Sequence, residues 1–205
     1  MGLTIAVGSM TVWAQPDAEE SHERLEVLLT TAPVLPAATR LSMINEAAAI
    51  WHAHRVAIDW LPPTAVRAVS EYRLRVLVVE RRPSGTTPGE AFTVGELLRP
   101  TNGHPVAMMS IESAQRLVAS VRGRAGYELV TVDQRRLGLV LGRALAHEIG
   151  HYLLGTHTHA NHGLMRPQFN ALEFTDLRDG TFALDRSASE WLKSRGQDDR
   201  FAYAR

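Results

Sequence analysis

The residues best suited to chemistry in this chain are histidines that lie late in the sequence. The chain of 205 residues has nine histidines, and five of them fall within one short stretch: His147, His151, His157, His159 and His162. Residues four apart share one face of a helix, so His147 and His151 can bind one metal ion through their ring nitrogens. Glu148 lies one residue round from that face, where its carboxylate can accept a proton from a water on the metal. The spacing HEIGH therefore predicts a Zn²⁺ site suited to hydrolysis, with Glu148 as the general base.

A zinc site of this kind needs a third protein ligand and keeps one position open. His157 follows a helix that should end at Gly155, and a chain that folds back there could bring this imidazole to the metal. His159 is the alternative, because residues two apart in an extended stretch point the same way. We therefore predict His157 as the third ligand with His159 as its alternative, and His162 as a solvated side chain.

The run from His147 to Pro167, HEIGHYLLGTHTHANHGLMRP, resembles the metzincin zinc peptidases, in particular their matrixin-like branch. That family shows H-E-x-x-H-x-x-G-x-x-H and then a methionine turn beneath the metal, and Met165 falls at the matching position. One departure is that Leu154 occupies the position of the family glycine, with Gly155 one residue later. The run is also similar to bacterial matrixin-like proteins ending in H-x-x-x-G-L-M-R, and this second spacing favours His159.

The resemblance implies a fold, an activity and a substrate. The fold would be α+β and metzincin-like, with an opening helix, a twisted mixed β-sheet, a central zinc-binding helix and a small C-terminal part after His157. The activity would be that of a zinc metalloendopeptidase acting on a peptide or protein, which would lie extended along the sheet edge. We expect the strand from Val106 to Ile111 to form that edge. The alternative function is a catalytically inactive zinc-binding or protein-interaction domain on the same fold.

Hydrophobic periodicity and turn residues place the elements around this motif. Four helices are predicted, over Leu41 to His54, Glu112 to Val121, Gln134 to Leu154 and Ser187 to Arg195. Three strands are predicted, over Val56 to Leu61, Arg73 to Glu80 and Val106 to Ile111. Within the longest helix, small residues recur every four positions, at Gly138, Gly142, Ala146 and Gly150. Such a stripe lowers helix propensity, so it predicts close packing against a neighbouring element.

Composition narrows the remaining possibilities. The chain has 22 Lys and Arg against 22 Asp and Glu, which gives no electrostatic reason to expect binding to nucleic acid or to an anionic membrane. Cysteine is absent, so disulfides, Cys-ligated zinc sites and thiol nucleophiles are excluded. Any metal must therefore be held by His, Asp or Glu.

The N-terminal segment from Leu3 to Ala14 is mostly apolar and ends in a pattern typical of a signal-peptide cleavage site, although no Lys or Arg precedes it. We predict that residues 1–20 are a remnant secretory signal and lead-in, and the sequence is acidic and polar from Pro16 to His22. Residues 21–205 then form a single catalytic domain. The expected protein is a secreted or periplasmic monomer without a membrane span.

Overall fold

The computed structural model describes residues 23–64, 73–81, 93–101, 104–122, 130–177 and 182–197. The predicted signal remnant lies outside these described residues. The strands are β1 (Glu23–Thr31), β2 (Val56–Leu61), β3 (Arg73–Val79), β4 (Gly95–Leu98) and β5 (Val106–Ser110). The helices are α1 (Ala37–His52), α2 (Ile111–Arg122), α3 (Val130–Leu154), α4 (Ala171–Thr175) and α5 (Arg186–Gln197). The described residues thus confirm an α+β fold with one mixed sheet.

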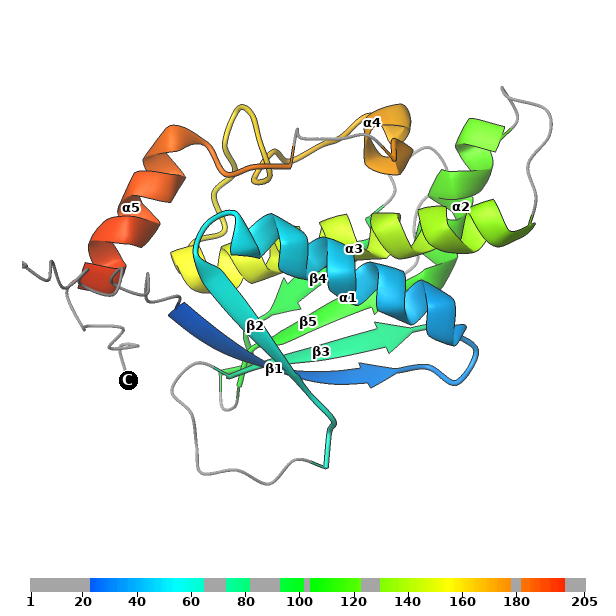
Figure 1. Ribbon diagram of the computed structural model, residues 1–205, viewed down its shortest axis with the longest axis horizontal. Helices are drawn as coiled ribbons and strands as arrows, with labels where there is room; N and C mark the ends of the chain where they lie inside the picture. Colours follow the sequence, from blue (N-terminus) through cyan, green and yellow to red (C-terminus); the bar gives the residue numbers. More distant parts are fainter. Residues whose placement is uncertain are drawn as a thin grey trace, which may run out of the picture.

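The sheet has the strand order β2-β1-β3-β5-β4, in which only the β4–β5 pairing is antiparallel. Helices α1 and α3 run side by side along the sheet, as Figure 1 shows. Their apolar side chains meet those of the strands in one core, to which Trp51, Leu145, Val27 and Val76 contribute fully buried side chains. The predicted opening helix and the central helix therefore form one layer against the sheet.

The expectation that the Val106 strand forms the sheet edge is wrong. This strand, β5, has β3 on one side and β4 on the other, so the edge nearest α3 is β4. The sequence of β4, Gly-Glu-Leu-Leu, is too short to show a period of two and begins with a residue that is unfavourable in strands. Its pairing with β5 creates the strand, and that long-range contact leaves no local pattern.

The boundaries of the helices and strands agree with the sequence where a local signal fixes them. Gly155 adopts a φ of 65° directly after the last residue of α3, as expected for a helix-ending glycine. The strand from Val56 to Leu61 has the predicted ends. Helix α3 begins at Val130, before the predicted start at Gln134, and strand β1 and helix α4 were not expected. Helix α4 starts with a capping box, in which Asn170 and Glu173 satisfy each other's backbone N–H groups.

The prediction that the small-residue stripe packs closely is confirmed, since α1 lies against it. A Cβ atom on Gly142 would lie 2.7 Å from both Glu46 Cβ and the Met43 carbonyl oxygen. At Ala146, the carbonyl accepts a 3.1 Å hydrogen bond from the buried Trp51 indole. Gly150 lies against the sulfur of Met165. The stripe therefore lets α1 and the Met165 segment approach the backbone of α3.

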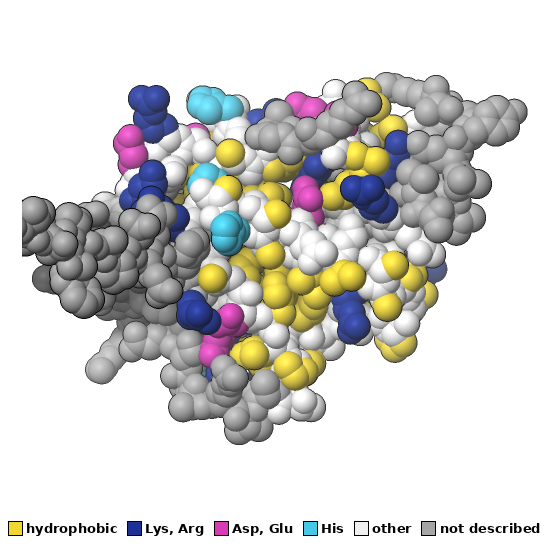
Figure 2. Space-filling view, in the orientation of Figure 1, with side chains coloured by type: hydrophobic (Ala, Val, Ile, Leu, Met, Phe, Trp, Pro, Cys, Tyr) yellow, Lys and Arg dark blue, Asp and Glu magenta, His cyan; other side chains and the backbone are white. Residues whose placement is uncertain are grey.

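The surface shows no single-sign charge field on the face drawn in Figure 2, where described basic, acidic and apolar side chains are interspersed. Such a distribution is typical of a globular surface and gives no electrostatic support for nucleic-acid binding by that face. Among the described residues, no helix combines the length and apolar character needed to cross a membrane.

The contact between α1 and α3 gives a test of stability. Alanine usually stabilises a helix by about 1 kcal/mol relative to glycine. In Gly142→Ala the new methyl group would collide with Glu46 and the Met43 backbone, so we expect the free energy of unfolding to fall by about 1–3 kcal/mol. Urea denaturation would measure the change, and an unchanged or increased value would contradict the packing described here.

Candidate metal centre

Three histidines converge near the C-terminal end of α3. One ring nitrogen each from His147, His151 and His159 lies within 4.8 Å of the others, close enough for one metal ion. His147 and His151 come from α3, one helical turn apart, and His159 comes from the irregular segment that follows. His157 lies outside this group, with its ring centroid 6.1 Å from that of His151. The geometry thus favours His159, the alternative, over His157 as the third ligand.

The local backbone explains why His159 and His157 differ although they lie two residues apart. The Thr156 hydroxyl accepts a 3.0 Å hydrogen bond from the Thr158 N–H and lies 2.7 Å from the Thr158 hydroxyl, so the side chains that flank His157 are bonded to each other. The Ala160 N–H donates to the Met165 carbonyl at 2.8 Å and fixes the chain directly after His159 to the Met165 segment.

Backbone carbonyls orient both helical imidazoles. His147 Nδ1 lies 2.7 Å from the Leu164 carbonyl oxygen, and His151 Nδ1 lies 2.8 Å from that of Thr156. A carbonyl can only accept, so each Nδ1 carries the proton and donates it. Each Nε2 then keeps its lone pair for a metal ion.

The environment also keeps these two imidazoles neutral. Burial lowers the pKa of His147 below its usual value. Burial, followed by repulsion from His147, lowers the pKa of His151 to about 4. Neutral imidazole is the form that binds a metal, so at pH 7 both side chains are in the state that a metal requires.

Met165 lies beneath the site and packs rather than ligates. It is buried, and its sulfur lies against Gly150, one residue before His151. The turn that presents it contains Gly163, whose φ of 74° favours glycine. The Leu164 N–H donates to the Ala183 carbonyl at 2.7 Å, so the C-terminal segment holds this turn in place. The turn in turn supplies the carbonyl that orients His147.

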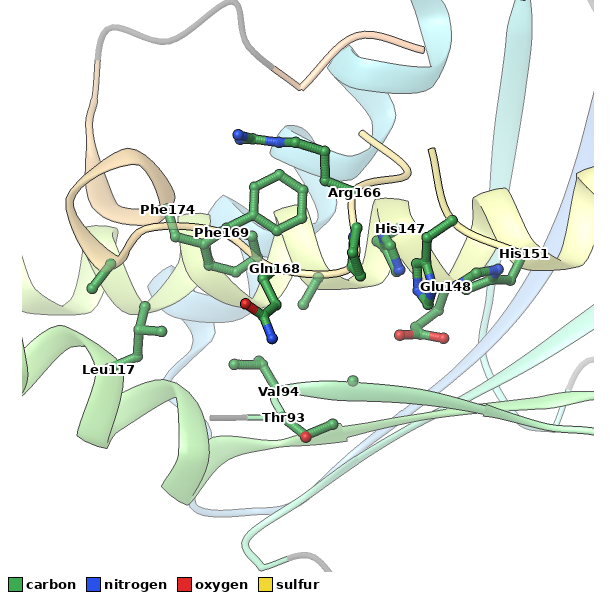
Figure 3. Close-up of a pocket in the computed structure, with 15 residues that line it drawn as sticks. Thr93, Val94, Leu117, His147, Glu148, His151, Arg166, Gln168, Phe169 and Phe174 are labelled. Atoms are coloured by element: carbon green, nitrogen blue, oxygen red, sulfur yellow. The ribbon is translucent and has the colours of Figure 1, made fainter. Parts of the chain in front are cut away.

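A cavity of about 600 Å³ opens beside the three histidines. Glu148, only 6% exposed, lines it together with His147, His151 and His159. Beyond them the cavity continues into an apolar recess lined by Leu117, Ala144, Phe169 and Phe174. In Figure 3 the Glu148 carboxylate points toward the strand that follows Thr93 and Val94, and Gln168 points into the cavity between the histidines and the recess. Polar groups suited to catalysis therefore adjoin space for an apolar side chain.

A buried arginine that the sequence analysis did not single out supports the recess. Arg143 lies one turn before His147 and is 2% exposed. Its Nε forms a 2.8 Å ion pair with Glu46 of α1, and its Nη1 donates at 2.9 Å to the Glu173 carbonyl of α4. The guanidinium also lies 4.5 Å from the ring centroid of Phe182. A lone charge within an apolar helical segment was the signal that could have revealed it.

His162 and His54 lie outside the group formed by His147, His151 and His159. His162 is exposed, as predicted for a solvated side chain. His54 instead accepts a 3.0 Å hydrogen bond at Nε2 from the Leu184 N–H, so it helps to hold the C-terminal segment. No protein-family model matches the chain, and no curated protein matches it, so the site is interpreted from its own geometry.

The third ligand can be tested with two single changes. Loss of a true ligand removes one of three bonds to the metal, so His159→Ala should weaken zinc binding by about 100-fold or more. His157→Ala, outside the group, should change zinc affinity by less than about threefold. Competition with a chelator of known affinity would measure both values. The reverse order of losses would make His157 the ligand.

The bond between His54 and Leu184 predicts a pH dependence of stability. Burial and, second, the charge of Lys193 lower the pKa of His54 below 6.5. The unfolded chain therefore binds this proton first as the pH falls, so the stabilising contribution is complete above about pH 6.5 and is lost below it. Between pH 8 and pH 5, the free energy of unfolding should fall less in His54→Gln than in wild type. Identical pH profiles would contradict this.

Proposed function

We propose that the protein is a zinc-dependent endopeptidase with a metzincin-like fold. The observation that carries the proposal is the convergence of three imidazoles and the Glu148 carboxylate on one cavity beside an edge strand. The turn that places Met165 beneath α3 supports a metzincin-like fold, because the Met165 side chain packs against Gly150 of the same helix that carries His147 and His151.

The donor set fits zinc. Neutral imidazole nitrogens are preferred zinc ligands, and three protein ligands are typical of a catalytic zinc site that keeps a position for substrate. Hydrogen bonds from Nδ1 to backbone carbonyls are the usual outer partners of zinc-binding histidines, and His147 and His151 both have them. A bound zinc ion would polarise the peptide carbonyl and make water a stronger nucleophile at neutral pH.

Glu148 has the position required of a general base. It lies one residue after His147 on α3, lines the same cavity, and is buried enough for its charge to act at low effective dielectric. In the proposed reaction its carboxylate takes a proton from the attacking water and then delivers that proton to the amine that leaves.

The substrate would bind along β4. Because β4 ends the sheet, its outer edge can pair with an extended peptide through main-chain hydrogen bonds. A peptide on this edge would pass over Glu148, since Gly95 of β4 lies against that side chain. The apolar recess of Leu117 and Phe174 would then receive one substrate side chain next to the bond that is cleaved.

The alternative function is a zinc-binding or interaction domain without turnover. The position of Glu148 favours turnover instead, because it places a carboxylate beside the histidines where a general base is required. Secretion or a periplasmic location also belongs to the proposal, on the basis of the apolar segment from Leu3 to Ala14.

Replacement of the base tests the mechanism. Glu148→Gln keeps the size of the side chain but removes the proton acceptor, so kcat on a mixed peptide library should fall about 100-fold or more. Zinc content, measured by elemental analysis, should stay near one ion per chain. The matched control is Glu190→Gln on α5, an exposed carboxylate outside the cavity, which should retain wild-type kcat.

Two outcomes would change the conclusion. Equal kcat values for Glu148→Gln and wild type would remove Glu148 from the role of base. A zinc-loaded wild type that cleaves nothing in the library would favour the inactive binding domain instead.

A further inference from the structure

The first residue of the edge strand faces Glu148 at very short range. A Cβ atom built on Gly95 would lie 3.0 Å from Glu148 Cγ and 3.1 Å from its Oε1. Ordinary contacts between such atoms are about 3.5–4.0 Å. A side chain at residue 95 would therefore need the Glu148 side chain to move by a few tenths of an ångström.

Backbone conformation does not explain this glycine. The described glycines with positive φ are Gly155 and Gly163, so Gly95 has a φ that alanine also adopts. Glycine is otherwise unfavourable inside a strand, because it costs conformational entropy and contributes no packing. The close approach of Glu148 is thus what glycine at this position permits.

The rest of β4 is fixed on the same helix. Alternate residues of a strand share one face, so Leu97 lies on the side of Gly95, and Arg99 follows directly after the strand. Leu97 is buried, and Arg99 Nη2 donates a 2.7 Å hydrogen bond to the carbonyl oxygen of His151. Glu148 and His151 are three residues apart on α3, so the strand is fixed to the helix at the metal ligand and passes over the base.

We propose that Gly95 is a positioning residue for Glu148: its lack of a side chain lets β4 pass directly over the carboxylate and defines where that carboxylate lies. The inference rests on the proposed peptidase function and adds to it. Strand β4 would then contact both the general base and the bound peptide, so it would fix their positions relative to each other. Displacements well below 1 Å matter to proton transfer, since catalytic groups must hold their geometry within about 0.5 Å.

Met109 is a second neighbour of residue 95, and the effect of crowding it must be distinguished from the effect of crowding Glu148. The same Cβ would lie 3.0 Å from the Cε of Met109, which pairs with Gly95 across the strands. The end of a methionine side chain is flexible and adapts to small changes, whereas Glu148 is buried on a packed helix. Crowding at Met109 would alter packing and stability, whereas crowding at Glu148 would alter kcat.

The kinetic test is Gly95→Ala in the zinc-loaded protein. We expect kcat to fall about tenfold or more, with KM and zinc affinity within about threefold of wild type. Gly142→Ala is the matched control: it crowds α3 from the side of α1, so it should lower the melting temperature without lowering kcat. A rise in KM at unchanged kcat would mean that Gly95 shapes the peptide strand rather than the base, and would overturn the proposal.

A double-mutant cycle shows whether the effect passes through Glu148. Once Glu148→Gln has removed the proton acceptor, adding Gly95→Ala should lower the residual kcat by less than about twofold. An equal loss in both backgrounds would mean that Gly95 acts independently of Glu148, which would overturn the proposal.

A readout independent of activity separates this inference from the proposed function. Crystal structures of the wild type and of Gly95→Ala, both metal-free, would be compared. The Glu148 carboxylate should be displaced in Gly95→Ala relative to wild type, with the rings of His147, His151 and His159 unmoved. An inactive wild type would end the peptidase proposal, yet the displacement would still decide whether Gly95 positions Glu148. An unmoved carboxylate would overturn the inference.

Discussion

Helix α3 is buried along most of its length, and polar groups that it carries into the interior must find partners there. The imidazoles of His147 and His151 find them in the carbonyls of Leu164 and Thr156. Two backbone carbonyls of the same helix accept hydrogen bonds from side chains outside it. The Ala146 carbonyl accepts from the Trp51 indole, and the His151 carbonyl accepts from the Arg99 guanidinium. The partners of this helix come from α1, the edge strand and the C-terminal segment, so its burial links all three to the metal centre.

The C-terminal segment acts as a support for the site rather than as a separate unit. It holds the Met165 turn through the Ala183 carbonyl, and that turn orients His147. Its three phenylalanines form one cluster with ring centroids 5.0–5.4 Å apart, in which Phe169 and Phe174 line the cavity and Phe182 packs against both. Arg143 joins this wall to α1 and α3. The arrangement of the three histidines and the shape of the recess are therefore coupled through one packed region.

The edge strand β4 lies on the opposite side of Glu148 from helix α3. Glu148 lies between α3, which carries it, and β4, which approaches it at Gly95. A carboxylate held on both sides loses little further freedom when a substrate arrives, which is the advantage of a site formed before binding. The same strand has an outer edge that an extended peptide can join, so one short element serves both the base and the substrate in the proposed reaction.

Local sequence determined three features: the histidine pair of HEIGH on one helical face, the end of α3 at Gly155, and the small-residue stripe that includes Gly142. Helix period and glycine conformation depend on neighbouring residues alone, so these features can be predicted from the sequence. Only the tertiary structure decided that His159 rather than His157 lies with His147 and His151, and the Ala160–Met165 hydrogen bond fixes the chain directly after it. It also decided that β4 is the edge, and that Gly95 and Arg143 bear on the site. Each of these depends on contacts between residues far apart in the chain, and such contacts leave no periodic mark in the sequence.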